Sequence, residues 1–135
     1  MSRHVISAGM DDTLQAVRDL FESHNFHHVV VLDDGKLVGV VSDRDLLMNI
    51  SPFVGGLAER PQDLRSMQRK VHQVMSRDPV WVTELTPIQD AARLMLQHDV
   101  SCLPVLDGRA GCRGIVTMRD ILRWLVKTDA CRLAA

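Results

Sequence analysis

The chain carries the same pattern of apolar runs and turn residues twice. Largely apolar runs occupy residues 27–32 and 101–106, and a turn sequence follows each of them. A second apolar run then comes at residues 37–41 or 113–116. Two such runs joined by a short Gly-containing turn are typical of a β-hairpin. The sequence therefore predicts one hairpin in each half of the chain.

A helical pattern precedes each hairpin, after a short strand-like run at residues 4–7 or 80–83. The apolar positions that fall on one helical face are Leu14, Val17, Leu20 and Phe21 in the first copy, and Ile88, Ala91, Ala92 and Met95 in the second. In the second copy Thr86, Pro87 and Gln89 have the order of an N-cap, a first-turn proline and a capping-box partner. Asp12 aligns with Thr86, so we expect Asp12 to cap the first helix.

A last helix follows each hairpin, so both copies have the order β-α-β-β-α. Neither copy is large enough to bury its sheet alone. We therefore predict a mixed α/β (α+β) fold in which two repeats pack sheet to sheet with pseudo-twofold symmetry. Residues 1–50 form repeat 1 and residues 71–135 form repeat 2. Residues 51–70, with paired Gly and two Pro, read as a linker with a short helix after Pro61.

Where the last strand of each repeat meets the last helix, the two repeats have nearly identical sequences: GVVSDRD at 39–45 and GIVTMRD at 114–120. Ser or Thr followed three residues later by Asp is a capping box, which stabilises a helix start by about 1 kcal/mol. A helix start also binds anions, and here Arg44 or Arg119 could pair with a phosphate. Spacing alone does not decide between helix capping and nucleotide binding.

Charge excludes one class of partner. The 16 basic and 17 acidic residues are interleaved and give a net charge of −1, whereas nucleic-acid binders carry a basic excess or stripe. No apolar run reaches the length of a membrane span, and the first ten residues lack the apolar core of a signal peptide. Three cysteines without a C-x-x-C motif fit free thiols. We expect a cytoplasmic protein that contacts neither nucleic acid nor membrane.

Catalytic and metal chemistry find little support. His24, His27 and His28 stand close together, but their spacing matches no standard metal-ligand pattern. No Ser or Cys lies in a nucleophile motif, and no carboxylates are spaced as an acid–base pair. The sequence predicts neither an enzyme nor a metal site.

Three features together resemble a known family. The paired junction motif, the LPVLD of residues 103–107 and the VMSRDPVWV of residues 74–82 look like a tandem CBS-domain pair, also called a Bateman module. The resemblance covers residues 4–127. It implies a regulatory sensor that requires no cofactor and binds AMP, ADP, ATP, NAD or S-adenosylmethionine in clefts between the two repeats.

The resemblance also assigns residues. The phosphate- and ribose-binding positions would be Ser42, Arg44, Asp45, Thr117, Arg119 and Asp120. The adenine would lie against Ile6, His28, Val30, Val82, Cys102 and Pro104. Asp43 stands where the second copy has Met118. Because an extra carboxylate repels a phosphate, we predict stronger binding at the Thr117/Asp120 site.

The resemblance further implies a homodimer and a regulated partner protein. The alternative function is a module for dimerisation or partner docking that binds no ligand, in which the two junction motifs serve as helix caps only.

Overall fold

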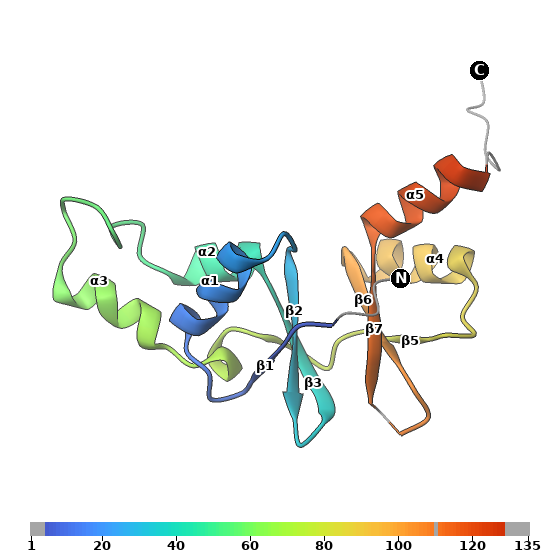
Figure 1. The fold of residues 1–135 in the computed structure, drawn as a ribbon, viewed down its shortest axis with the longest axis horizontal. Helices are drawn as coiled ribbons and strands as arrows, with labels where there is room; N and C mark the ends of the chain where they lie inside the picture. Colours follow the sequence, from blue (N-terminus) through green and yellow to red (C-terminus); the bar gives the residue numbers. More distant parts are fainter. Residues whose placement is uncertain (1–4, 110, 129–135) are drawn as a thin grey trace. The chain divides into compact units, whose positions relative to one another are not determined.

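The computed structural model describes residues 5–109 and 111–128, which form two sheets with helices (Figure 1). The chain divides into two compact units, residues 6–79 and residues 80–128 together with Val5. Each unit contains the predicted order of strand, helix, two strands and helix. The mixed α+β fold class is confirmed, and each unit is described by itself below.

The first unit is built on a four-stranded sheet with the order β1-β2-β3-β4. β1 runs parallel to β2, and the other neighbours are antiparallel. The strands are β1 (Ser7–Gly9), β2 (His28–Asp33), β3 (Lys36–Ser42) and β4 (Ser76–Arg77). The helices are α1 (Leu14–Ser23), α2 (Asp43–Asn49) and α3 (Pro61–Arg65), with 3-10 turns η1 (Ser66–Gln68) and η2 (Val71–Gln73).

Helices α1 and α2 cover one face of this sheet. Their buried side chains Leu14, Val17 and Leu46 share a core cluster with Val29, Val31 and Val41 of the strands. The predicted hairpin joins β2 to β3 through Asp34 and Gly35, which have φ angles of 52° and 78°. Two positive φ angles define the type I′ turn that suits tight hairpins, and Asp-Gly is a preferred pair for it.

The segment 51–70 is a folded part of the first unit. Its short helix α3 begins at Pro61, in agreement with the sequence prediction. The buried carboxylate of Asp63 accepts hydrogen bonds from Ser51 Oγ at 2.8 Å and from the backbone N–H of Arg60 at 2.8 Å. The bond from Ser51, followed by those from Arg60, lowers the pKa of Asp63. The charged carboxylate of Asp63 in α3 thus binds Ser51, the first residue of the segment.

Residues 71–79, which read as the start of repeat 2 in the sequence, lie in the first unit. The backbone N–H of Val71 donates to Asp12 O at 2.8 Å, and β4 pairs with β3 at Gly39 and Val40. The limits of the compact units therefore differ from the limits of the sequence repeats.

The second unit has a three-stranded sheet of order β5-β6-β7, in which β5 is parallel to β6. Its strands are β5 (Val82–Thr83), β6 (Cys102–Leu106) and β7 (Cys112–Thr117), and its helices are α4 (Ile88–His98) and α5 (Met118–Thr128). Ala91 and Met95 of α4 pack against Val82, Leu103 and Val105. Among the described residues, this core has fewer members than that of the first unit.

Two local predictions were wrong. The first strand lies at Ser7–Gly9, three residues later than expected, and His4 lies outside the described residues. The N-cap position of α1 is Thr13, whose side chain accepts from Ala16 N–H, and that of α4 is Pro87, which makes no side-chain cap hydrogen bond, rather than Asp12 and Thr86.

The physical reason for the shifted caps is the same in both units. Asp12 Oδ2 accepts from the backbone N–H of Gly9 at 2.8 Å, and Thr86 Oγ1 accepts from that of Thr83 at 3.1 Å. Each side chain closes the turn before its helix, so it competes with the capping role. The alignment of Asp12 with Thr86 is correct, but the shared role is turn closure.

Candidate functional site

The β3–α2 junction of the first unit is a complete capping box. Ser42 Oγ accepts from the backbone N–H of Asp45 at 3.0 Å, and Asp45 Oδ2 accepts from the backbone N–H of Ser42 at 2.9 Å. Both side chains are partly buried, and the carboxylate stands at the positive end of the helix dipole. The predicted box is confirmed here.

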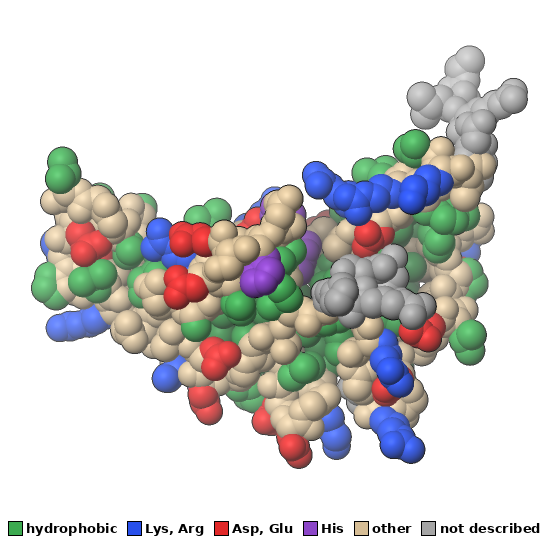
Figure 2. All heavy atoms as spheres, viewed as in Figure 1, with side chains coloured by type: hydrophobic (Ala, Val, Ile, Leu, Met, Phe, Trp, Pro, Cys, Tyr) green, Lys and Arg blue, Asp and Glu red, His purple; other side chains and the backbone are tan. Residues whose placement is uncertain are grey.

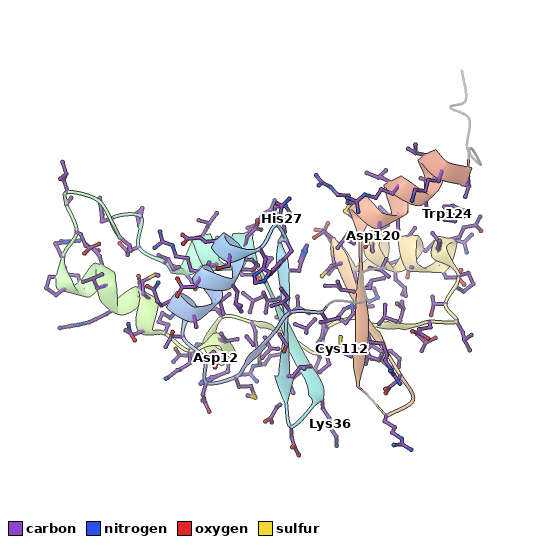
Figure 3. All side chains as sticks on the ribbon, viewed as in Figure 1. Asp12, His27, Lys36, Cys112, Asp120 and Trp124 are labelled. Atoms are coloured by element: carbon purple, nitrogen blue, oxygen red, sulfur yellow. The ribbon has the colours of Figure 1, made fainter. Side chains whose placement is uncertain are left out.

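The β7–α5 junction of the second unit repeats this arrangement. Asp120 Oδ2 accepts from the backbone N–H of Thr117 at 2.9 Å, and Thr117 Oγ1 accepts from that of Asp120 at 3.2 Å. The Thr117 hydroxyl also donates to Asp120 Oδ2 at 3.1 Å, and Arg123 lies 3.7 Å from Asp120 Oδ1. Asp120 thus stands at the start of α5, one turn before Trp124 (Figure 3).

The arginine of each motif points into solvent. Arg44 and Arg119 are exposed, and neither makes a hydrogen bond or ion pair with any residue in the described part of the chain. A guanidinium in the first turn of a helix adds positive charge where the free N–H groups already favour an anion. Each junction therefore combines a hydroxyl, a carboxylate and an unpaired cation within four residues.

The two junctions share a backbone frame and differ in one pair of side chains. The N–H of Asp43 donates to His27 O at 3.0 Å, and the N–H of Met118 donates to Ser101 O at 3.0 Å. In the first unit His27 Nδ1 also lies 2.8 Å from Asp43 Oδ2, and His27 stands directly before β2 (Figure 3). The second unit cannot form this His–Asp pair because it has Ser and Met at these positions.

Four of the residues predicted to contact adenine lie on the helix-free face of their sheets. Side chains alternate along a strand, and Val29 and Val31 of β2 belong to the core under the helices. His28 and Val30 therefore face the other side, as do Cys102 and Pro104 of β6. His28 pairs in register with Ser42, and Cys102 pairs with Thr117. The strand register thus brings a predicted adenine contact beside each junction hydroxyl.

On this face, the environment of His28 shifts its pKa. Burial lowers the pKa of His28, against the opposing attraction of Asp43 and Asp45. The imidazole is consequently held towards its neutral form, which can accept as well as donate a hydrogen bond.

The two remaining adenine residues are not equivalent to each other. Val82 pairs with Val105 and belongs to the helix-side core of its unit, whereas the same register position in the first unit is taken by Ala8, which pairs with Val31. Ile6 lies before β1, and its carbonyl accepts from Val30 N–H at 3.4 Å. Val82 therefore does not lie on the face defined above.

The glycine of the first motif has a structural role. A Cβ atom on Gly39 would lie 2.6 Å from Met75 Sδ and 2.9 Å from the backbone oxygen of Ser76. The segment that leads into β4 approaches Gly39 closely, so the packing of the protein explains why a glycine stands here without any reference to a ligand.

Sequence reasoning missed two side chains at the junctions. The spacing of Asp120 and Arg123, three residues apart on one helix, is a signal that could have revealed their ion pair. The contact between His27 and Asp43 has no local signal, because it depends on the register of the hairpin.

The described residues show neither a metal site nor a membrane-spanning helix. Within residues 5–109 and 111–128 no three side chains of His, Cys, Asp or Glu gather closely enough to hold a metal ion. None of the helices described here has both the length and the apolar composition that crossing a bilayer requires.

Comparison with known proteins now identifies the family. The profile of the CBS domain matches residues 1–52 and 71–127. The chain belongs to the CBS-domain family. A CBS domain-containing protein of Dictyostelium discoideum is 36% identical over 131 residues, which cover 94% of this chain and 88% of the relative. Several other relatives are much longer, and the chain spans 22% to 45% of their length.

Solved CBS-domain pairs share the fold. The crystal structure of CBSX2 in complex with AMP matches with a TM-score of 0.78 and 28% identity, over 96% of this chain and 94% of that one. The CBS-domain pair of protein MJ0100, in complex with 5-methylthioadenosine and S-adenosyl-L-methionine, matches with a TM-score of 0.74 and 25% identity, over 92% and 93% of the two chains. These CBS-domain neighbours bind adenosine-containing molecules.

Proposed function

We propose that this CBS-domain protein is a regulatory, non-catalytic module that binds an adenosine-containing ligand, with AMP, ADP and ATP as the first candidates. The observation that carries the proposal is the repeated junction, in which an exposed arginine without a partner lies beside a capped helix start. The adenosine ligands of CBSX2 and MJ0100 support it. A cytoplasmic location and an unidentified regulated protein belong to the same proposal.

In this proposal the two ends of the ligand meet different groups. The free N–H groups of the α2 or α5 start and the adjacent arginine hold the phosphate. The Asp45 or Asp120 carboxylate accepts from the ribose hydroxyls. The adenine lies towards the helix-free face, near His28 and Val30 or near Cys102 and Pro104. Binding would act by favouring whichever conformation holds the ligand more tightly.

The arginines provide a sharp test, because removing them breaks no hydrogen bond or ion pair among residues 5–109 and 111–128. Titration calorimetry with AMP, ADP and ATP would compare the wild type with Arg44→Ala and Arg119→Ala. Arg65→Ala is the matched control, since it removes the same charge from the exposed end of α3. A hydrogen bond to a charged group contributes about 1.5–3 kcal/mol, so we expect about a tenfold to hundredfold loss of affinity.

The Asp43 carboxylate leads us to expect the larger loss for Arg119→Ala, because we rank the Thr117/Asp120 site as the stronger phosphate site. Equal losses for the two arginine variants would contradict this ranking. Losses no larger than that of Arg65→Ala would contradict phosphate binding at either junction.

A second candidate function is dimerisation or partner docking without a ligand, and we propose a homodimer in either case. Exposed apolar side chains on α2 and α5, among them Leu47 and Leu122, favour such contacts. A thermal-shift panel with AMP, ADP, ATP, NAD and S-adenosylmethionine separates the two functions. A ligand at a hundredfold excess over its Kd stabilises the native state by about 2.7 kcal/mol, and no shift with any of the five would favour the second function.

A further inference from the structure

The loop between α2 and α3, residues 51–60, lies almost wholly outside the CBS profile. The profile match ends at residue 52 and resumes at residue 71. The two ends of the loop are held together by Asp63, which accepts from Ser51 Oγ and from the backbone N–H of Arg60, each at 2.8 Å. A compact surface loop whose ends lie close together is an Ω-loop, and such loops are frequently functional.

Side chains within the loop hold its shape. The Arg60 guanidinium lies 5.9 Å from the centre of the Phe53 ring, and Arg60 Nε lies 3.4 Å from Asp63 Oδ2. The Glu59 carboxylate accepts from the backbone N–H of Gly55. A loop that is ordered before binding loses less conformational entropy when a partner binds. The 51–60 loop is therefore suited to recognition.

The apolar side chains of this region face solvent. Leu57 is fully exposed, and Phe53 and Leu64 are 46% and 48% exposed. Arg60 and Leu64 are four residues apart, so they lie on one side of α3, and Arg60 lies over the Phe53 ring. We call Phe53, Leu57, Arg60 and Leu64 the loop patch (Figure 2). Exposed apolar side chains that gather mark an interaction site, and aromatic and Arg side chains often dominate binding energy.

The surroundings of the loop patch are basic. Residues 51–70 contain four basic and two acidic residues, a net charge of +2 in a chain whose total is −1. Arg60 pairs with Asp63. Arg65 is exposed and makes no hydrogen bond or ion pair with any residue in 5–109 or 111–128. An apolar patch with a basic border complements a surface that is apolar and acidic.

We propose that the loop patch docks a partner protein through a segment of that partner in which apolar side chains alternate with Asp and Glu. The inference rests on the proposed function only for the partner's role as the regulated protein, since docking itself needs no ligand. An anionic membrane also attracts apolar and basic side chains, but lipid recognition by charge uses clusters of about 4–8 Lys and Arg. The excess of two positive charges here favours the protein partner.

Peptide selection tests the proposal without knowledge of the partner. A displayed library of random linear peptides is selected on the wild-type chain, and fluorescence anisotropy measures the affinity of each selected peptide. We expect peptides rich in Leu, Phe, Asp and Glu. We expect Leu57→Ser and Arg65→Glu to bind them about tenfold more weakly, a change of 1.4 kcal/mol. Because both residues are exposed, both variants should keep the wild-type melting temperature.

The matched controls lie in the second unit. Leu85→Ser changes a residue that is 92% exposed on the turn before α4, and Arg109→Glu reverses an exposed charge in the β6–β7 turn. Both should bind the selected peptides as the wild type does. Peptides that bind Leu57→Ser and Arg65→Glu as tightly as the wild type overturn the proposal, and so does a set of selected peptides that is basic rather than acidic.

Two further measurements keep the outcomes separate. Vesicles of phosphatidylcholine and phosphatidylserine that bind the wild type but not Leu57→Ser would assign the loop patch to a membrane and overturn docking of a protein. Titration with AMP should give the same affinity for the wild type, Leu57→Ser and Arg65→Glu. A wild type that binds the selected peptides through the loop patch but binds no nucleotide refutes the proposed ligand site alone.

Discussion

Replacing Gly39 with alanine tests how the first unit holds the β4 segment. The new Cβ would lie 2.6 Å from Met75 Sδ and 2.9 Å from the Ser76 carbonyl oxygen. The thioether can rotate away, but the carbonyl is fixed by the pairing of β4 with β3. Overpacking of this kind costs about 1–3 kcal/mol. We expect a loss near the middle of that range, about 2 kcal/mol, which lowers the melting temperature by about 8 °C.

Gly108→Ala is the matched control, because no atom lies within 4 Å of its added Cβ. Chemical denaturation of both variants gives the free energies of unfolding, and titration with AMP gives the affinities. We expect Gly39→Ala to lose stability and Gly108→Ala to stay within about 0.5 kcal/mol of the wild type. Equal stability of the two variants would refute the close approach of Met75 and Ser76. A stable Gly39→Ala protein with impaired AMP binding would instead indicate that Gly39 is part of the ligand site.

Three further predictions follow from shifted pKa values. Burial lowers the pKa of His28 from 6.5, so the unfolded chain binds this proton more readily than the folded protein. The contribution of neutral His28 to the free energy of unfolding is therefore full above pH 6.5 and is lost as the pH falls. In denaturation curves from pH 8 to 5, His28→Gln should reduce this loss of stability, and the same dependence of stability on pH in the variant and the wild type would contradict the prediction. The backbone amide of Arg109, followed by other donors of the loop, lowers the pKa of Asp107 from 3.8. Asp107→Asn should therefore lower the free energy of unfolding above pH 3.8. The difference in stability between this variant and the wild type should narrow as the pH falls through the lowered pKa of Asp107 in the folded protein. Burial raises the pKa of the Cys112 thiol. In a Cys102→Ser and Cys131→Ser background, a chromogenic disulfide reagent at pH 8 should modify Cys112 more slowly in the folded protein than in the unfolded chain, and equal rates would exclude a protected thiol.

Local signals in the sequence predicted the elements that depend on neighbouring residues. The Asp34–Gly35 turn, the start of α3 at Pro61 and the capping box at Ser42 each involve residues at most three apart. The residues that make hydrogen bonds within such a span can be read directly from neighbouring positions in the sequence. The caps of α1 and α4 failed at the same range, because Asp12 and Thr86 had two local hydrogen-bonding choices and the sequence does not rank them.

Long-range features were beyond sequence reasoning. β4 consists of Ser76 and Arg77, two exposed residues with no apolar pattern that could mark a strand. Its position is set by the space above Gly39, which lies more than thirty residues earlier in the chain. For the candidate site, the residues of each junction were predicted from the motif, but the hairpin register was needed to place His28 opposite Ser42.

The junction motif contains residues that the fold needs and residues that it does not. Ser42, Thr117 and the aspartates three residues later cap helices, so their presence in both copies is explained without a ligand. Gly39 is explained by the approach of Met75 and Ser76. Arg44 and Arg119 are different, because within the described residues they make no hydrogen bond or ion pair. An arginine that has no polar partner in the described chain, yet stands in both copies at a helix start where anions bind, is the part of the motif that argues for a phosphate.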